Sequence, residues 1–493
     1  MPHPKSDNHF GFARWEWNPV SSAFWALILL LAAAFVLGGS ARGDVASLMV
    51  LRPLAAGLLG FAVWQLRFEQ VKQHRLVAAM ALAVVALPLV QLVPLPEAIW
   101  SHFPGRQQVV DIDRVAGLGK IARPLSLVPD ETLNALLSLV VPLAALALGI
   151  QLDRKALERL LPVLLGLIGV SALFALMQTL GGSDGPLYFY DVTNRGSAVG
   201  LLANRNHQAV LLAMAIPMLA LLASRTGDNR AFLMAGALIA VLVLLPLILV
   251  TGSRAGAIVG LLALLSVGLV IPLRTGLGED RRVNARKLTR IWPSAAAGAA
   301  LLALGLIGLT VYLGRADAIN RLAASLSDDD LRFRIIPTVA EMFLRYSPVG
   351  TGLGSFEAIF QANEPDALLG PVYMNHAHND WLETGLTGGL PGIFLLFVAT
   401  VGTAAGIVRN FMRRTGQVAP DRFARVGLIL IALAGVASLS DYPLRTPLFE
   451  SVFIVAVLWA SCPLPRYETR AGNMQDHSDI GCDESNQLKF SSH

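Results

Sequence analysis

Long apolar runs, each followed by a shorter polar segment, make up most of the 493-residue chain. A helix needs roughly 20 apolar residues to cross a hydrocarbon layer about 30 Å thick, and most of the runs approach this length. The pattern therefore predicts an all-α polytopic membrane protein with about 12 transmembrane helices. The expected spans are residues 22–39, 45–66, 76–96, 132–151, 158–180, 207–224, 231–250, 255–273, 293–313, 386–408, 426–440 and 447–463.

The polar segments between the runs differ in charge. Lys and Arg are concentrated in the segments that follow even-numbered spans, such as 274–292 and 409–425, and are sparse in the short segments that follow odd-numbered spans. Cytoplasmic loops of membrane proteins carry the excess of Lys and Arg. We therefore expect both termini in the cytoplasm. The segments expected on the opposite side are 97–131, 181–206, 251–254, 314–385 and 441–446.

The composition agrees with a membrane protein. Hydrophobic residues account for 54% of the chain and charged residues for 15%, whereas a soluble domain has about 25% charged residues. The net charge of +5 comes from the basic loops, so it indicates orientation in a lipid bilayer, and we expect no nucleic-acid partner. The longest polar loop lies away from the midpoint of the chain, which argues against two equivalent transporter halves.

The ends of the chain are expected to differ from the bundle. A cleaved signal peptide is a competing interpretation of the first span, but Asp7 and Glu16 make its leader a poor match. The sequence has two cysteines, Cys462 and Cys482, both expected on the cytoplasmic side and therefore without a disulfide. The expected parts are a cytoplasmic N-terminal segment (1–21), a transmembrane bundle (22–463) and a cytoplasmic, disordered tail (464–493).

The large loop between spans nine and ten, residues 314–385, holds most of the candidate chemistry. Apolar positions in residues 330–346 recur at spacings near three and four, which predicts a helix. Arg332 and Arg334 lie in its first turn and could reach a negative group at the membrane surface. An amphipathic helix on the interface, with its arginines solvated among headgroups, explains the pattern equally well.

Two further motifs in this loop have plainer explanations. The three carboxylates at 328–330 suggest Mg²⁺ or Mn²⁺. Consecutive residues of a helix do not converge on one point, however, so we expect a solvated helix start and no metal. The segment GTGLG at 350–354 allows positive φ and a close backbone approach to a ligand. A turn that joins two segments is the better explanation for at least two of its glycines.

His376 and His378 are separated by one residue, so they would share a face of an extended segment. A neutral imidazole is a competent base near pH 7 and could take a proton from a sugar hydroxyl. The residues that follow, Asn379, Asp380 and Glu383, could orient an imidazole, as catalytic bases commonly require. A pair of solvated loop histidines is the alternative, and it is the better explanation when this loop is considered alone.

Two more positions are expected at the same membrane face. Arg254 lies in a hairpin between two spans, TGSRAG at 251–256, while Arg205 and His207 open the sixth span in NRNH at 204–207. Arginine can bind a diphosphate bidentately and stabilise a phosphate leaving group. An arginine at a membrane boundary is more often one that snorkels to the headgroups.

Together these motifs resemble the bacterial O-antigen ligase and O-antigen polymerase superfamily over about residues 195–450. The resemblance is strongest in SRA at 253–255, the helix containing Arg332, PVGTGLGSF at 348–356 and HNDWLE at 378–383. No single motif is specific to the family. The similarity rests on the order of the motifs and on their expected common location. The chain departs from the family in lacking a tryptophan after the helix arginine, and in having NRNH in place of Asn-Pro-Asn-His.

The resemblance implies a membrane glycosyltransferase of lipopolysaccharide biosynthesis, in the bacterial inner membrane. It would transfer a glycan from undecaprenyl diphosphate to a glycan or lipid-core acceptor at the periplasmic face, with inversion and without metal or other cofactor. His378 would activate the acceptor, and Arg254 and Arg332 would hold the diphosphate, with Arg334 competing for the role of Arg332. The segment SDYPLR at 440–445 also looks like a family segment that shapes the outer face. The other candidate substrate-binding residues are Arg205, His207, His376 and Asn379.

Three alternatives stay open at this point. A ligase and a polymerase use the same type of donor, so the sequence does not separate them. A secondary transporter of polar or lipid-linked substrates fits the span count and inside termini equally well, and Arg52 is the one charge expected deep in the membrane. A relative of the peptidoglycan-polymerising membrane enzymes would depend on Asp380 or Glu383 more than on His378.

Overall fold

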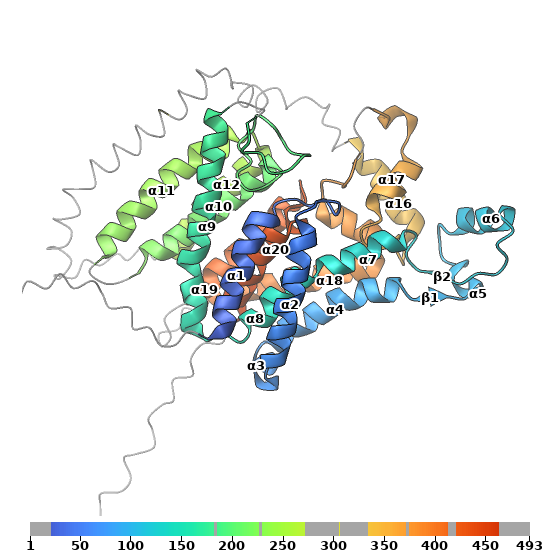
Figure 1. Cartoon of the computed structure of the whole chain (residues 1–493), viewed down its shortest axis with the longest axis horizontal. Helices are drawn as coiled ribbons and strands as arrows, with labels where there is room; N and C mark the ends of the chain where they lie inside the picture. The colour runs from blue at the N-terminus through green and yellow to red at the C-terminus, as the bar shows by residue number, and fades with distance from the viewer. Residues whose placement is uncertain are drawn as a thin grey trace, which may run out of the picture. The chain divides into compact units, whose positions relative to one another are not determined.

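The computed structural model describes residues 21–181, 185–225, 229–271, 305, 334–370, 374–412 and 421–462, and every structural statement below concerns these residues. They are helical in most of their length, with one pair of two-residue strands (Figure 1). They all belong to a single unit of the chain, Met1–Cys462. The all-α class predicted from the apolar runs is therefore confirmed.

The helices follow one another with short connections. In the first half of the chain they are α1 (Ser22–Leu37), α2 (Leu48–Gln65), α3 (Phe68–Gln73), α4 (Arg75–Gln91), α5 (Glu97–Trp100), α6 (Gln107–Val115), α7 (Pro129–Ser138), α8 (Val140–Gly149), α9 (Arg154–Leu180) and α10 (Arg205–Ala223). In the second half they are α11 (Arg230–Val250), α12 (Arg254–Val270), α16 (Ile336–Tyr346), α17 (Phe356–Asn363), α18 (Asp380–Met412), α19 (Arg422–Ala437) and α20 (Pro447–Ser461), with short 3₁₀ turns η1 (Asp366–Leu368) and η2 (Pro443–Arg445).

Within the described residues, six helical segments are long and apolar enough to cross a membrane: α2, α7 with α8, α9, α10, α11 and α18. Four shorter apolar helices, α1, α4, α12 and α20, accompany them. A multi-pass membrane protein is thus supported. The count of twelve spans and the position of the large loop stay predictions, because the expected ninth span, 293–313, lies outside the described residues apart from Gly305.

Helix α10 forms the centre of the bundle and packs against α9, α11, α12 and α19 (Figure 1). It is buried on all sides, which agrees with its sequence, because a helix that is apolar all round has no polar face to present to water. Small residues permit close contact with its neighbours. A Cβ on Gly256 of α12 would lie 2.2 Å from the Cβ of Ala209, so these two helices need glycine at their crossing. The first turn of α10 is therefore held in a fixed place.

The loop between α4 and α7 is fixed by a short sheet and a buried arginine. Strands β1 (Pro94–Leu95) and β2 (Arg123–Pro124) pair antiparallel, with Leu95 opposite Arg123. The guanidinium of Arg106 is 2% exposed and donates to the carbonyl oxygens of Leu125 and Gly350. This loop is therefore tied to the glycine-rich segment that follows α16.

The glycine-rich segment at 350–354 is a turn that packs on other backbone. Gly350, Gly352 and Gly354 all have positive φ, at 82°, 105° and 83°. The amide of Gly352 donates to the carbonyl oxygen of Thr387 at 2.9 Å, and a Cβ on Gly350 would lie 2.6 Å from the nitrogen of Gly389. Glycine is required here for conformation and contact, which supports the turn interpretation.

The helix predicted at 330–346 is present as α16 over Ile336–Tyr346, and its expected start at 330–333 lies outside the described part. Its apolar face is as the spacing predicts: Ile335, Val339 and Met342 are buried and form a second core with α17 and the segment before α18. Pro337 stands at the opening of α16, where its missing donor costs no helix bond.

Helix α18 also differs from the predicted tenth span, because it begins at Asp380 and not at residue 386. It is kinked at Gly389, where φ is 62° and ψ is −157°. This conformation is essentially confined to glycine. The segment HNDWLE at 378–383 therefore leads directly into the first turn of a long helix, and its polar side chains take positions fixed by that helix.

Candidate active site

Three histidines surround one aromatic ring in the hairpin between α19 and α20, residues 438–446. The centroid of the Tyr442 ring lies 5.2 Å from that of His207, in an edge-to-face contact. The rings of His376 and His378 lie closer, with centroids 4.3 and 5.0 Å from it. The start of α10, the segment before α18 and this hairpin thus meet at one place.

Asp441, the residue before this tyrosine, joins the same segments through its carboxylate. Its Oδ1 lies 3.3 Å from Nδ1 of His378, and its Oδ2 accepts from Nδ2 of Asn206 at 2.7 Å. The carboxylate is 2% exposed. A buried carboxylate next to an imidazole fixes the ring orientation and favours a proton on the adjacent nitrogen. In that tautomer Nδ1 of His378 donates to Asp441, and Nε2 keeps a lone pair.

His378 holds an unusual backbone conformation. Its φ is 48°, and among the described residues no other residue except glycine has a positive φ. Such a conformation costs about 1–3 kcal/mol and persists only where the surroundings determine it. Here Asn379 contributes, because its Oδ1 accepts from the amide of Leu382 at 3.0 Å and so caps the first turn of α18. The capped start of α18 therefore holds the backbone of His378, the candidate base, in this conformation.

His207 is buried in the packing between α10 and the hairpin. It is 1% exposed, and neither ring nitrogen has a hydrogen-bond partner among the described residues. Its Nε2 lies 3.7 Å from Oδ1 of Asp441, and its ring also contacts Phe449 edge to face. This placement supports a packing and electrostatic contribution more than contact with a substrate.

A second ionic group lies beside the first and centres on Arg445, which η2 places at the end of the hairpin. Its Nε donates to Oδ1 of Asp380 at 2.7 Å, and its NH1 lies 3.1 Å from Oε1 of Glu383. The same Oε1 lies 3.0 Å from Nδ1 of His376. Glu383 also accepts from the amide of Ala377 at 2.8 Å. Each histidine of the HAH motif therefore has its own carboxylate.

The guanidinium of Arg445 stays charged in this group. Burial opposes its charge, but the carboxylates of Glu383 and Asp380 outweigh this effect and raise the pKa of Arg445. Because the arginine is held by two carboxylates, it is a bridge between the hairpin and α18. Arg445 therefore fixes the side chains of Asp380 and Glu383 in place.

Arg254 is the first residue of α12, where Ser253 caps the helix by accepting from the amide of Gly256 at 2.9 Å. Gly256 packs on Ala209 of α10, two residues after His207. The hairpin that carries Arg254 therefore lies against the same helix start that contacts the histidine group. The hairpin and the histidines, far apart in sequence, are brought to the same end of α10.

The other candidate arginines are placed differently. Arg334 is exposed and donates to the carbonyl oxygen of Ala367 at 2.9 Å, on the side of η1. Arg205 is partly buried at the start of α10, where its amide donates to Oδ1 of Asn194. Arg332 lies outside the described residues.

No group of His, Cys, Asp and Glu suited to a metal ion occurs in the part of the chain that the structure describes. The carboxylates at 328–330 lie outside that part. The expectation that the protein uses no metal therefore stays a prediction, which measurements with a chelator can test.

The fold and this polar group together define a multi-pass helical membrane protein with clustered imidazoles, carboxylates and arginines at one hairpin. Residues 239–397 match the family model described as O-antigen ligase. That segment runs from α11 into α18 and includes Arg254, His376 and His378. The resemblance to the O-antigen ligase and O-antigen polymerase superfamily is thereby confirmed, and it indicates a glycan-transferring enzyme. No curated protein matches the chain.

Sequence reasoning recognised part of this group. It singled out both histidines of the HAH motif and Arg254, and it named Asp380 and Glu383 as residues that could orient an imidazole. Glu383 does lie next to His376, whereas the carboxylate next to His378 is that of Asp441, from another hairpin. Tyr442 lies in the segment SDYPLR that the resemblance included, but it was assigned no role, because a single aromatic residue in a short loop carries no periodic signal.

Proposed function

We propose that the protein transfers a glycan from an undecaprenyl diphosphate carrier to an acceptor hydroxyl at the extracytoplasmic face of a bacterial inner membrane. The observation that carries this proposal is the pairing of His378 with Asp441 inside a chain that matches the O-antigen ligase family. An imidazole oriented by a buried carboxylate is suited to remove a proton from a hydroxyl.

In the proposed reaction Nε2 of His378 takes the proton of the acceptor hydroxyl. The acceptor oxygen forms a bond to the anomeric carbon while the bond from that carbon to the phosphate oxygen breaks, and the diphosphate leaves with the electron pair. Displacement from the opposite side inverts the configuration. Asp441 stabilises the imidazolium that forms, because its negative charge lies 3.3 Å from Nδ1.

The leaving diphosphate needs positive charge close to it. We assign this contribution to Arg254 and to Arg332, with Arg334 as the substitute for Arg332. Arginine binds phosphate oxygens bidentately and keeps its charge at any accessible pH. The position of the Arg254 hairpin against the start of α10 supports its part in this assignment. Fixed guanidinium groups would do the work that a divalent cation does in other glycosyltransferases.

The test uses purified full-length protein and an undecaprenyl-diphosphate oligosaccharide in the presence of a chelator, with and without a lipid-core acceptor. Lengthened donor would identify a polymerase, and modified acceptor a ligase. His378→Ala should abolish product while the protein still inserts and unfolds as the wild type does. Near-normal product from that variant would remove His378 from the mechanism. Absence of turnover together with uptake into vesicles would favour a transporter.

A further inference from the structure

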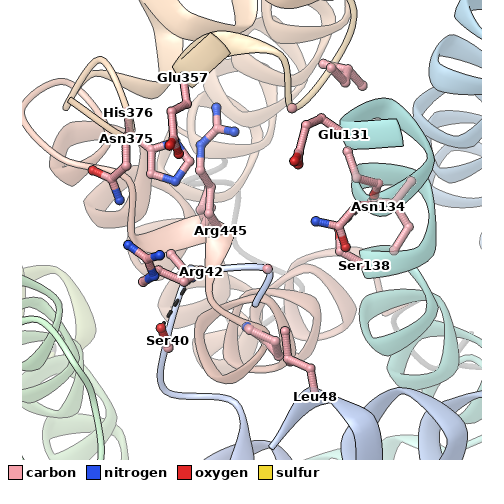
Figure 2. Close-up of a pocket in the computed structure, with 18 of the residues that line it drawn as sticks. Ser40, Arg42, Leu48, Glu131, Asn134, Ser138, Glu357, Asn375, His376 and Arg445 are labelled. Carbon is pink, nitrogen blue, oxygen red and sulfur yellow. Dashed lines mark hydrogen bonds between the residues drawn. The ribbon is translucent and has the colours of Figure 1, made fainter. Parts of the chain in front are cut away.

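A cavity of about 810 Å³ opens beside the Arg445 group (Figure 2). Its walls come from the loop after α1, from α2, α7 and α17, and from the beginnings of α18 and α20. His376, Asp380 and Arg445 belong to both the cavity wall and the ionic group. The volume lies within the range of about 300–1,000 Å³ typical of ligand sites.

The lining is mixed in charge and formally acidic. Six carboxyl side chains and three arginines line the cavity. Each arginine already has a partner: Arg42 pairs with Asp44 at 2.7 Å, Arg52 donates to Asn134 at 2.7 Å, and Arg445 is held as described above. A diphosphate placed here would meet more carboxyl groups than guanidinium groups, which is unfavourable in a partly enclosed site.

Several acceptors that line the same cavity have no ion-pair or hydrogen-bond partner among the described residues. Within the described part of the chain, Glu131 of α7 and Glu357 of α17 form no ion pair, and Figure 2 shows both side chains at the rim of the space between their helices. Oε2 of Glu450, in the first turn of α20, is buried without a hydrogen-bond partner. A buried acceptor left unsatisfied costs about 1–3 kcal/mol, which favours a ligand that donates a hydrogen bond to Glu450. Glu131 and Glu357 are exposed, so their carboxylates are accessible to the same ligand.

We propose that this cavity binds the hydroxyl-rich sugar portion of a substrate, and that Glu131, Glu357 and Glu450 accept hydrogen bonds from its hydroxyl groups. Hydroxyls can donate to carboxylates and accept from the amide of Asn134, which also lines the cavity. The diphosphate is then held elsewhere, toward Arg254. The assignment rests on the proposed function only in naming the sugar as part of a lipid-linked donor or of its acceptor.

Binding measurements on purified full-length protein in nanodiscs test this proposal without turnover. The probes are undecaprenyl diphosphate without glycan, the oligosaccharide released from the lipid-linked donor, and the dephosphorylated core oligosaccharide of the source bacterium. The variant combines Glu131→Gln with Glu357→Gln. The matched control is Glu364→Gln, at the end of the same helix α17 and outside the cavity lining.

The double variant should weaken the binding of one oligosaccharide by about tenfold or more, as loss of hydrogen bonds to charged acceptors predicts. The oligosaccharide affected identifies the source of the sugar, donor or acceptor. Binding of undecaprenyl diphosphate should be unchanged, and the control should behave as the wild type. Unchanged binding of both oligosaccharides would overturn the proposal. So would tighter binding of undecaprenyl diphosphate, because that result would place the phosphates in the cavity.

The two proposals can fail separately. If the wild type transfers glycan and the double variant binds both oligosaccharides normally, only the cavity assignment fails. If the wild type binds an oligosaccharide through these glutamates and no glycan transfer is found, the sugar site stands and the transfer reaction falls.

Discussion

Oδ1 of Asp441 and Nδ1 of His378 lie 3.3 Å apart although the two residues are 63 positions apart in the chain. The carboxylate comes from the hairpin between α19 and α20, and the imidazole from the segment that leads into α18. Asp441 therefore holds Nδ1 of His378, and Nε2 stays available to take a proton. We therefore expect the transfer rate to depend on both residues of this pair.

Asp441→Asn should lower the transfer rate by about 10²–10³-fold, because the amide no longer fixes the tautomer or stabilises the imidazolium. The donor KM should change little, since Asp441 is not assigned to the donor. Steady-state kinetics with the lipid-linked donor separate the two quantities. Ser440→Ala, an exposed neighbour in the same hairpin, serves as the control and should retain full activity. A variant Asp441→Asn with a normal rate would show that His378 needs no carboxylate.

Arg254→Lys should keep the charge but lose bidentate binding, and transfer should fall by about tenfold to a hundredfold. Arg254→Ala should reduce product below detection. Kinetics at several donor concentrations would show whether the KM or the maximal rate changes. Arg195→Gln is the matched control, because this arginine is exposed in the loop before α10. Equal loss in the control would point to general surface charge and not to Arg254.

Arg445→Leu should destabilise the protein by about 3–5 kcal/mol, because the buried carboxylates of Asp380 and Glu383 then lose the guanidinium charge that holds them. Thermal unfolding in detergent measures the change. Adding Asp380→Asn should recover part of the loss, since one of the two carboxylates is neutralised. Additive destabilisation in the double variant would contradict the ion pair seen between Arg445 and Asp380.

Gly389→Ala should lower the unfolding temperature, because φ there is 62° and a Cβ would lie 2.3 Å from the carbonyl oxygen of Pro348. The expected cost of the conformation alone is about 1–3 kcal/mol. Gly402→Ala is the control on the same helix, since a Cβ there meets no other atom within 4 Å. It should be neutral or slightly stabilising. If both variants unfold alike, the kink of α18 is not held by the turn at 348–350.

Chelation should leave glycan transfer unchanged, because arginines supply the positive charge in the proposed reaction. The measurement compares initial rates with excess chelator and with added Mg²⁺ or Mn²⁺. A rate that falls with chelator and returns with a metal ion would contradict the prediction and direct attention to the carboxylates at 328–330. Asp329→Asn would then show whether these residues are responsible.

Much of the local structure follows from the order of residues alone. The apolar runs predict the helices because a backbone in hydrocarbon must satisfy its own hydrogen bonds. The start of α9 at Arg154 and of α12 at Arg254 follow from side chains that cap a helix, Asp153 and Ser253. The apolar face of α16 follows from its spacing. Boundaries were less accurate, as the earlier start of α18 shows.

The sequence alone indicates the class of the protein, most of its helices and the residue types that could perform glycan transfer. The tertiary structure alone decided that Asp441 serves His378, that Glu383 serves His376, and that Arg445 joins the hairpin to α18. These pairings join segments whose separation in sequence carries no distance information. They arise because packing around α10 fixes where each loop ends, and the short-range pattern of a chain cannot encode that.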